Sequence, residues 1–149
     1  MENQRKYPLS FFFQLSFKGE DAAFQEVSGI SKEYKMEEVG CGGENRFKYR
    51  LPTTQSSQNL VLKRALVPKN SSLANWCAHT LDDNLANAIN PQDLRVSLMK
   101  SKKEPLVTWD FFNAYPIKYM VSDLKSDENK IAIETIELAY NYFKIPSKN

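Results

Sequence analysis

Residues 9–17 read Leu-Ser-Phe-Phe-Phe-Gln-Leu-Ser-Phe, and this stretch indicates the fold class. Every odd position in it is apolar, whereas three of the four even positions carry Ser or Gln. A period of two places the odd-numbered side chains on one face of a β-strand. We therefore predict a strand whose apolar face turns Phe11, Phe13 and Leu15 toward a core.

Further segments along the chain also favour strands. They cover residues 24–30, where Gly29 allows a bulge or bend, and residues 60–67, 93–100, 106–112, 117–124 and 130–145. In the last segment the apolar positions change from odd to even near Thr135, which predicts a β-bulge there. A helix is the competing interpretation of that segment, and its β-branched and aromatic residues disfavour it. From these strands we expect core positions at Trp109, Ile133 and Leu138.

One segment has a helical period instead. Its apolar positions recur at i, i+3, i+4, i+7 and i+8, namely at Leu73, Trp76, Cys77, Thr80 and Leu81. This spacing predicts an amphipathic helix that buries Leu73 and Trp76. The preceding Asn70, Ser71 and Ser72 are candidates for its N-cap. The length of 149 residues corresponds to about one domain and shows no linker or repeat, so we expect one mainly β domain over residues 1–149.

Residues 31–51 are too polar to form a core. Two charged segments flank the glycine-rich residues 40–43, which predicts a hairpin with the glycines at its tip. The glycines do not match a phosphate-binding loop, and no helix follows them. A two-stranded ribbon buries little surface and is marginal by itself in water, so another partner is expected to cover it or pair with it. The polar residues 52–59 are expected to form a surface loop.

Composition argues against several function classes. The chain has 20 basic and 18 acidic side chains and a net charge of +2, which disfavours a polyanion-binding protein. No window approaches the length of an apolar membrane span, and the polar N-terminus is no signal peptide. Two cysteines, Cys41 and Cys77, make no disulfide framework, so we expect the protein to be made and folded in a reducing cytoplasm.

The histidine count argues against catalysis and metal binding. His79 is the only histidine and follows Cys77 by two residues, so on a helix the two side chains point in different directions. Cys41 belongs to the separate glycine-rich segment. We therefore expect no metal site, no cofactor and no catalytic residues, and we do not expect an enzyme.

Six strings, taken together in this order, resemble the inner-tube proteins of contractile phage tails. They are residues 42–47 with 50–52, residues 59–64, the pair Trp76 and Cys77, Trp109 with residues 114–116, residues 121–123, and residues 133–143. Within that group the chain looks most similar to the tube proteins of extracellular injection particles of the antifeeding-prophage type. The resemblance covers roughly residues 7–145.

The resemblance implies a non-enzymatic structural protein. Its fold would be a mainly β, tail-tube-like barrel with one flanking helix and an extended β-hairpin, similar to the haemolysin-coregulated protein of type VI secretion. Six copies would form a ring, and rings would stack into a hollow tube driven through a target envelope by sheath contraction. The implied partners are other copies, the sheath protein, baseplate and tube-terminator proteins, and a cargo effector or nucleic acid in the lumen. The protein would be synthesised in the bacterial cytoplasm and assembled into a phage-tail-like particle, and release of that particle from the cell stays open.

The resemblance also assigns a contact to the predicted hairpin. It places Gly42, Gly43, Glu44, Asn45, Arg46 and Phe47 in a segment that reaches the adjacent ring, and Lys48 and Arg50 continue that segment. Mixed charges there would set register rather than add much affinity. Glu134 and Glu137 lie on the last strand, and one of them is expected to face the lumen or the sheath. Two alternatives remain: a tube-initiating ring protein at the baseplate, and a monomeric β-barrel domain with a ligand-binding or enzymatic pocket.

Overall fold

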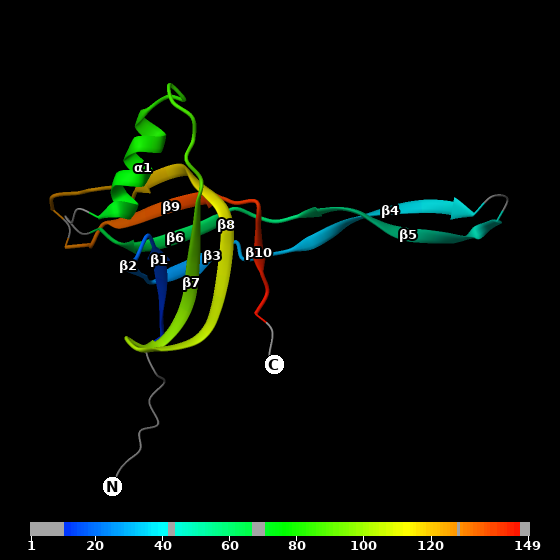
Figure 1. The fold of residues 1–149 in the computed structure, drawn as a ribbon, viewed down its shortest axis with the longest axis horizontal. Helices are drawn as coiled ribbons and strands as arrows, with labels where there is room; N and C mark the ends of the chain where they lie inside the picture. The colour runs from blue at the N-terminus through cyan, green and yellow to red at the C-terminus, as the bar shows by residue number, and fades with distance from the viewer. Residues whose placement is uncertain (1–10, 42–43, 67–70, 128, 147–149) are drawn as a thin grey trace, which may run out of the picture.

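The computed structural model describes residues 11–41, 44–66, 71–127 and 129–146. These residues form ten strands and one helix, which Figure 1 shows in chain order. The elements are β1 (Phe12–Phe17), β2 (Glu20–Phe24), β3 (Glu26–Ser28), β4 (Glu33–Cys41), β5 (Glu44–Ser56), β6 (Leu60–Ala65), α1 (Ser72–Asp82), β7 (Gln92–Ser101), β8 (Glu104–Val121), β9 (Ile133–Ala139) and β10 (Tyr142–Lys144).

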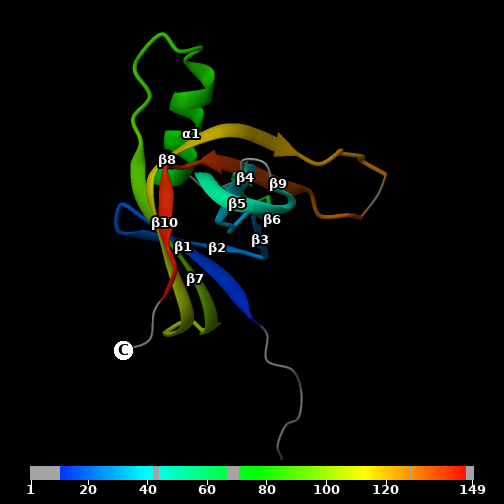
Figure 2. The same cartoon turned by 90° about the vertical axis from the view of Figure 1, so that its right-hand side faces the viewer.

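Eight strands form the body of the molecule. Seven of them follow the order β2-β1-β7-β8-β9-β6-β3, and β10 pairs with β8 beside this path. The two end strands are joined by the single residue Gln25, whose backbone N–H donates to the Lys63 carbonyl at 2.9 Å. Residues 20–28 therefore supply both end strands of the sheet, β2 and β3, in one continuous segment. Figures 1 and 2 show the resulting strongly curved, barrel-like sheet with α1 against one side. The predicted mainly β fold with one flanking helix is confirmed.

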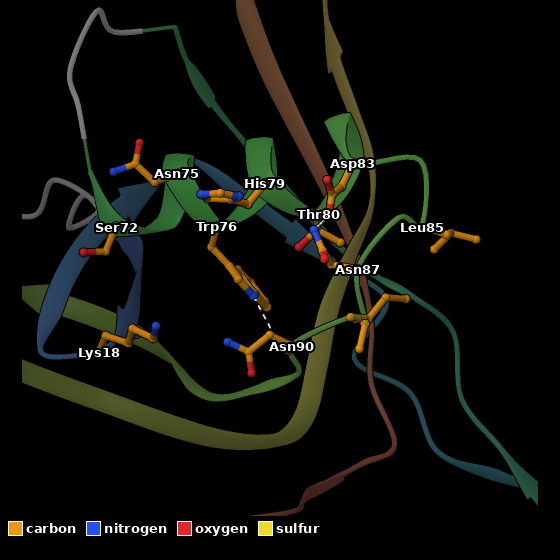
Figure 3. Close-up of a pocket in the computed structure, with 12 residues that line it drawn as sticks. Lys18, Ser72, Asn75, Trp76, His79, Thr80, Asp83, Leu85, Asn87 and Asn90 are labelled. Atoms are coloured by element: carbon orange, nitrogen blue, oxygen red, sulfur yellow. Dashed lines mark hydrogen bonds between the residues drawn. The ribbon is translucent and has the colours of Figure 1, made fainter.

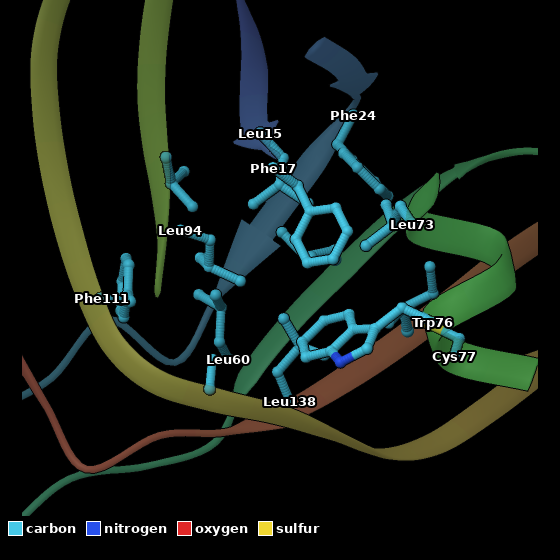
Figure 4. Packing of buried hydrophobic residues seen from close by; sticks show 14 of the residues in the cluster. Leu15, Phe17, Phe24, Leu60, Leu73, Trp76, Cys77, Leu94, Phe111 and Leu138 are labelled. Atoms are coloured by element: carbon cyan, nitrogen blue, oxygen red, sulfur yellow. The ribbon is translucent and has the colours of Figure 1, made fainter. Parts of the chain in front are cut away.

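The core lies between the curved sheet and α1, as Figure 4 shows. The helix contributes Leu73, Trp76 and Cys77 to it. The Trp76 ring packs with its centroid 4.7 Å from that of Phe17, and its indole N–H donates to the Asn90 carbonyl at 2.9 Å. The polar atom of this large side chain is thereby satisfied. Ser71 is the N-cap, and its hydroxyl oxygen accepts from the Ala74 backbone N–H at 3.1 Å.

Of the eight expected core residues, four are buried: Leu15, Leu73, Trp76 and Leu138. Phe13 and Trp109 are half-buried and pack against the core cluster. The expectation for Phe11 is wrong, because it precedes the first residue of β1 and its side chain is 51% exposed. Ile133 is only half-buried, at the end of β9 where it pairs with Ala65.

Two local predictions fail for identifiable reasons. No bulge occurs at Thr135, because β9 pairs with β6 in unbroken register, and the irregularity lies on β8 between Pro116 and Lys118. The even-numbered residues of β9 face the interior along the whole strand. One of them is the charged Glu134, so the sequence shows no apolar side chain at that position and the apolar positions only appear to change phase near Thr135. The loop expected over residues 52–59 is also wrong in its first half, since β5 continues to Ser56.

Candidate functional site

Strands β4 and β5 form an arm that projects away from the body, as Figure 1 shows. They make a separate two-stranded sheet, and among the described residues they pair with no other strand. Nine residues of β4 at about 3.4 Å each give the arm a reach of about 30 Å. The predicted charged hairpin is therefore present and stands free of its own body.

The predicted contact residues gather on this arm. Glu44, Asn45, Arg46, Phe47 and Lys48 form the first part of β5. Arg50 follows on the same strand, directly opposite Glu38 of β4. Gly42 and Gly43 lie outside the described residues.

The two faces of the arm differ in chemistry. Directly opposed residues of antiparallel strands place their side chains on the same face. Val39 lies opposite Tyr49, and Glu37 lies opposite Leu51, so one face carries three apolar side chains. We call Val39, Tyr49 and Leu51 the apolar face. The opposite face carries the Glu38 and Arg50 pair together with the exposed Tyr34 and Met36, which lie across from Gln55 and Pro52.

The apolar face is exposed in the isolated subunit. Tyr49 is 62% exposed, Leu51 49% and Val39 40%. Contiguous apolar surface of this kind marks interaction sites on soluble proteins. Proline lacks an N–H donor and is therefore confined to the edges and bulges of sheets. Pro52 is tolerated because β5 is an edge strand and the register shift between Tyr34 and Met36 lies beside it. In addition, the Thr53 hydroxyl donates to the Lys35 carbonyl at 3.0 Å.

The arm joins the body through a compact root, which we define as residues 29–32 and 57–59. Gly29 has a φ of +91°, and a Cβ there would lie 1.8 Å from the Asn59 carbonyl oxygen. Only glycine fits this position, both for its conformation and for this close approach. The Gln58 backbone N–H donates to the Ser31 hydroxyl oxygen at 3.1 Å, which links the two legs of the root. Sequence reasoning marked Gly29 as a bend but did not find the contacts around it.

A partly buried polar network lies under α1. The Arg64 Nε is 2.7 Å from Glu134 Oε1, and the Tyr119 hydroxyl donates to Glu134 Oε2 at 2.7 Å. The Arg64 guanidinium also lies 4.8 Å from the centre of the Phe24 ring. Glu134 therefore faces the subunit interior, whereas Glu137 accepts from the Asn59 side-chain amide at 2.9 Å.

This network changes the chemistry of its neighbours. Burial, with a smaller contribution from the Glu134 charge, raises the pKa of the Cys77 thiol to about 12. Burial and the hydrogen bond to Glu134 raise the pKa of Tyr119 to about 12 as well. A thiol with this pKa stays protonated near neutral pH and is a poor nucleophile and a poor metal ligand.

The only histidine lies elsewhere. Figure 3 shows His79 beside a cavity of about 420 Å³ between α1 and the loop that follows it, with Trp76 and Asn90 at its floor. The rest of its lining is mostly polar, with Lys18, Ser72, Asn75 and Asp83 among the residues. Cys77 points instead into the core (Figure 4). Within the described residues, no three His, Cys, Asp or Glu side chains form a group that could hold a metal ion.

The described part of the chain contains no helix with the length and apolar character needed to cross a membrane.

Comparison with known proteins shows which family and which solved structures share this architecture. The family model described as T4-like virus tail tube protein gp19 matches residues 9–144. A search of curated proteins finds no match. One similar solved structure is a chain of the PVC sheath-tube complex of an extracellular contractile injection system in the extended state. It is 25% identical, with 96% of this chain and 94% of that chain covered and a TM-score of 0.77.

Two further structures show how widely this fold is shared. A chain of the PVC sheath/tube terminator in the extended state is 25% identical over 95% of this chain and 99% of that chain, with a TM-score of 0.76. Hcp1 from Flavobacterium johnsoniae shares the fold at 15% identity, with 90% of this chain and 94% of that chain covered and a TM-score of 0.60. The family match spans nearly the whole chain, and so this protein belongs to the T4-like virus tail tube protein gp19 family.

Proposed function

We propose that this chain is the inner-tube subunit of a contractile injection system, and that six copies form rings that stack into a hollow tube. The free-standing arm carries the proposal, because among the described residues its strands pair with no strand of the body and its apolar face is exposed. Membership of the tail tube family supports the same role, as does similarity to chains of a sheath-tube complex and a sheath/tube terminator.

In this proposal the arm joins one ring to the next. Burial of the apolar face would supply most of the contact energy, at about 25 cal/mol for each Å² of apolar surface removed from water. The opposite face, with Arg50 and Glu38, would select the rotation between rings through charge complementarity. Glu44 to Lys48 continue the same strand toward the tip and would share this contact.

The proposed role is that of a conduit and not of an enzyme. The high pKa of the Cys77 thiol and the exposed position of His79, beside a cavity that Cys77 does not line, fit a protein whose polar groups serve structure. Sheath contraction would drive the tube, with sheath, baseplate and terminator proteins as partners and an effector or nucleic acid in the lumen. The subunit would be made in the bacterial cytoplasm and incorporated into a phage-tail-like particle. No feature of the described residues favours a tube-initiating ring or a monomeric ligand-binding domain over this role.

Electron microscopy of the purified protein tests the proposal directly. Wild-type protein is expected to show six-fold rings or tubes, and a stable monomer at high concentration would contradict the assembly. The double variant Arg46→Glu/Arg50→Glu should retain the melting temperature but lose long tubes. The matched control Lys102→Glu/Lys103→Glu reverses two charges in the turn between β7 and β8 and should assemble normally. Tubes of wild-type length from the arm variant would refute the role of the arm.

A further inference from the structure

We propose that the C-terminal segment, residues 140–144, is a clamp that sets the direction of the arm, with Tyr140 and Lys32 as its positioning residues. The consequence for assembly rests on the proposed function, whereas the clamp itself is a property of the single subunit. The clamp would decide whether a subunit presents its arm at the angle that a neighbouring copy can receive.

The direction of the arm has to be set at its root. In the described residues β4 and β5 pair only with each other, so no strand pairing along their length holds them against the body. An arm of about 30 Å that tilts by about 10° moves its end by about 5 Å, which equals one strand spacing in a sheet. A small error at the root would therefore displace the apolar face by a whole strand at its partner.

Tyr140 holds residues 29–32, the first leg of the root. Its hydroxyl donates to the Gly29 carbonyl at 3.2 Å, at the residue where the chain turns through a positive φ. Burial raises the pKa of Tyr140, and hydrogen bonds with the Ser57 side chain and the Ser31 backbone oppose that rise. The hydroxyl therefore ties the C-terminal segment to the first leg of the root at Gly29.

The Tyr140 ring is itself held in place. It meets the Phe111 ring edge to face at a centroid distance of 4.9 Å and the Phe143 ring at 5.9 Å. Phe143 is 3% exposed, and its strand β10 pairs with β8 at Phe111. These aromatic contacts connect the hydroxyl to the rigid sheet of the body.

Lys32 provides the second attachment, at the base of β4. Its ammonium donates to the Phe143 carbonyl oxygen and lies 4.6 Å from the centre of the Phe143 ring. A cation over an aromatic face is attracted by the ring quadrupole, and the carbonyl satisfies one ammonium donor. The returning leg is held by Asn59, whose amide donates to Glu137 of β9 at 2.9 Å. Both legs thus end on strands of the body.

The test measures the angle of the arm in the unassembled subunit. Spin labels at Val39→Cys on the arm and Lys102→Cys on the body, in a Cys41→Ser background, report a distance distribution by double electron–electron resonance. The variant Lys32→Met/Tyr140→Phe removes the ammonium and the hydroxyl but keeps the alkyl stem and the ring. We expect its distance distribution to be at least twice as wide as that of the parent.

Two control substitutions match the chemistry at residues other than the two positioning residues Lys32 and Tyr140. Lys35→Met makes the same change three residues further along the arm, and Tyr142→Phe removes a hydroxyl from the neighbouring exposed ring. Both should keep the parent distribution. A parental width and mean in Lys32→Met/Tyr140→Phe, or equal broadening in the controls, would overturn the clamp. If the double variant does not fold, Lys32→Met and Tyr140→Phe are measured separately, and each is expected to widen the distance distribution.

The result is separable from the proposed function. A widened distribution in a protein that never forms tubes would support the clamp and refute the tube role. In an assembling protein, the clamp variant is expected to form at least tenfold fewer tubes at an unchanged melting temperature. Lost assembly with a parental distance distribution would overturn the clamp, because assembly would then fail for another reason.

Discussion

The body and the arm are built from the same kind of antiparallel strand, but they bury their side chains to opposite extents. In the body, Leu60 and Leu138 face each other across β6 and β9 and have no exposed surface. In the arm, Val39 and Tyr49 are paired in the same way and are largely exposed. A strand is therefore stabilised by what covers its face, and the subunit by itself covers only the body. The contrast predicts that substitutions in the body change folding and that those in the arm change association.

The largest effect is expected from Trp76→Ala in the body. This change removes a ring that packs on Phe17 and loses the hydrogen bond to Asn90. We expect a loss of about 3–5 kcal/mol in the free energy of unfolding, as for other large-to-small core changes. Urea denaturation measures it. A wild-type midpoint would show that this helix face does not contribute to the core.

A loss of similar size is expected from Glu134→Leu. The substitution leaves Arg64 without its carboxylate and Tyr119 without its acceptor, and removing one partner of a buried pair costs about 3–5 kcal/mol. The double variant Arg64→Leu/Glu134→Leu removes both charges and should recover most of this loss. Urea denaturation of Glu134→Leu, Arg64→Leu and the double variant gives the coupling energy between the two side chains. A double variant as unstable as the sum of the singles would contradict the pairing.

Alkaline pH should destabilise the body through Cys77. The unfolded thiol begins to lose its proton near its ordinary pKa of 9, whereas the folded pKa is raised to about 12 by burial. The stabilising contribution is therefore complete below pH 9 and is lost as the pH rises toward 12. The melting temperature of Cys77→Ala should fall less steeply above pH 9 than that of wild type. Parallel curves would contradict this assignment, and Tyr119 should add a decline that begins near pH 10 in both proteins.

The smallest effect on folding is expected in the arm. Tyr49→Ala should change the free energy of unfolding of the isolated subunit by less than about 0.5 kcal/mol, because the side chain is exposed. The same variant should shorten or abolish tubes in the microscope, because it removes the largest side chain of the apolar face. Thr54→Ala, at another exposed position of β5, is the control. Destabilisation of the subunit by Tyr49→Ala would mean that the arm contributes to the fold after all.

Much of the fold could be read from local patterns. The two-residue period predicts β1, and the spacing from Leu73 to Leu81 predicts α1, because each pattern reflects one buried face. The charged ribbon around the glycines predicts the arm, since so polar a hairpin cannot be buried. The same two-residue period gives the wrong expectation for Phe11. A period shows which face of a strand is apolar, but it does not show where along the strand the burial of that face ends.

The candidate site was predictable only in part. The arm and its charges are visible in the sequence, whereas the root depends on residues far apart, with Lys32 and Phe143 separated by 111 positions. Glu134 shows the same limit, because a carboxylate in a strand is interpreted as exposed until its partners Arg64 and Tyr119 are known. Pairings of this kind leave no periodic signal.

Residue order alone determined the β class, the single helix and the presence of a polar arm, because these depend on neighbours within one strand or one helical turn. Only the tertiary structure decided the path of the sheet, the burial of Glu134 and the attachment of the arm root to the C-terminal segment. These features arise where distant parts of the chain meet, and the free energy of such contacts depends on distances that residue spacing does not encode.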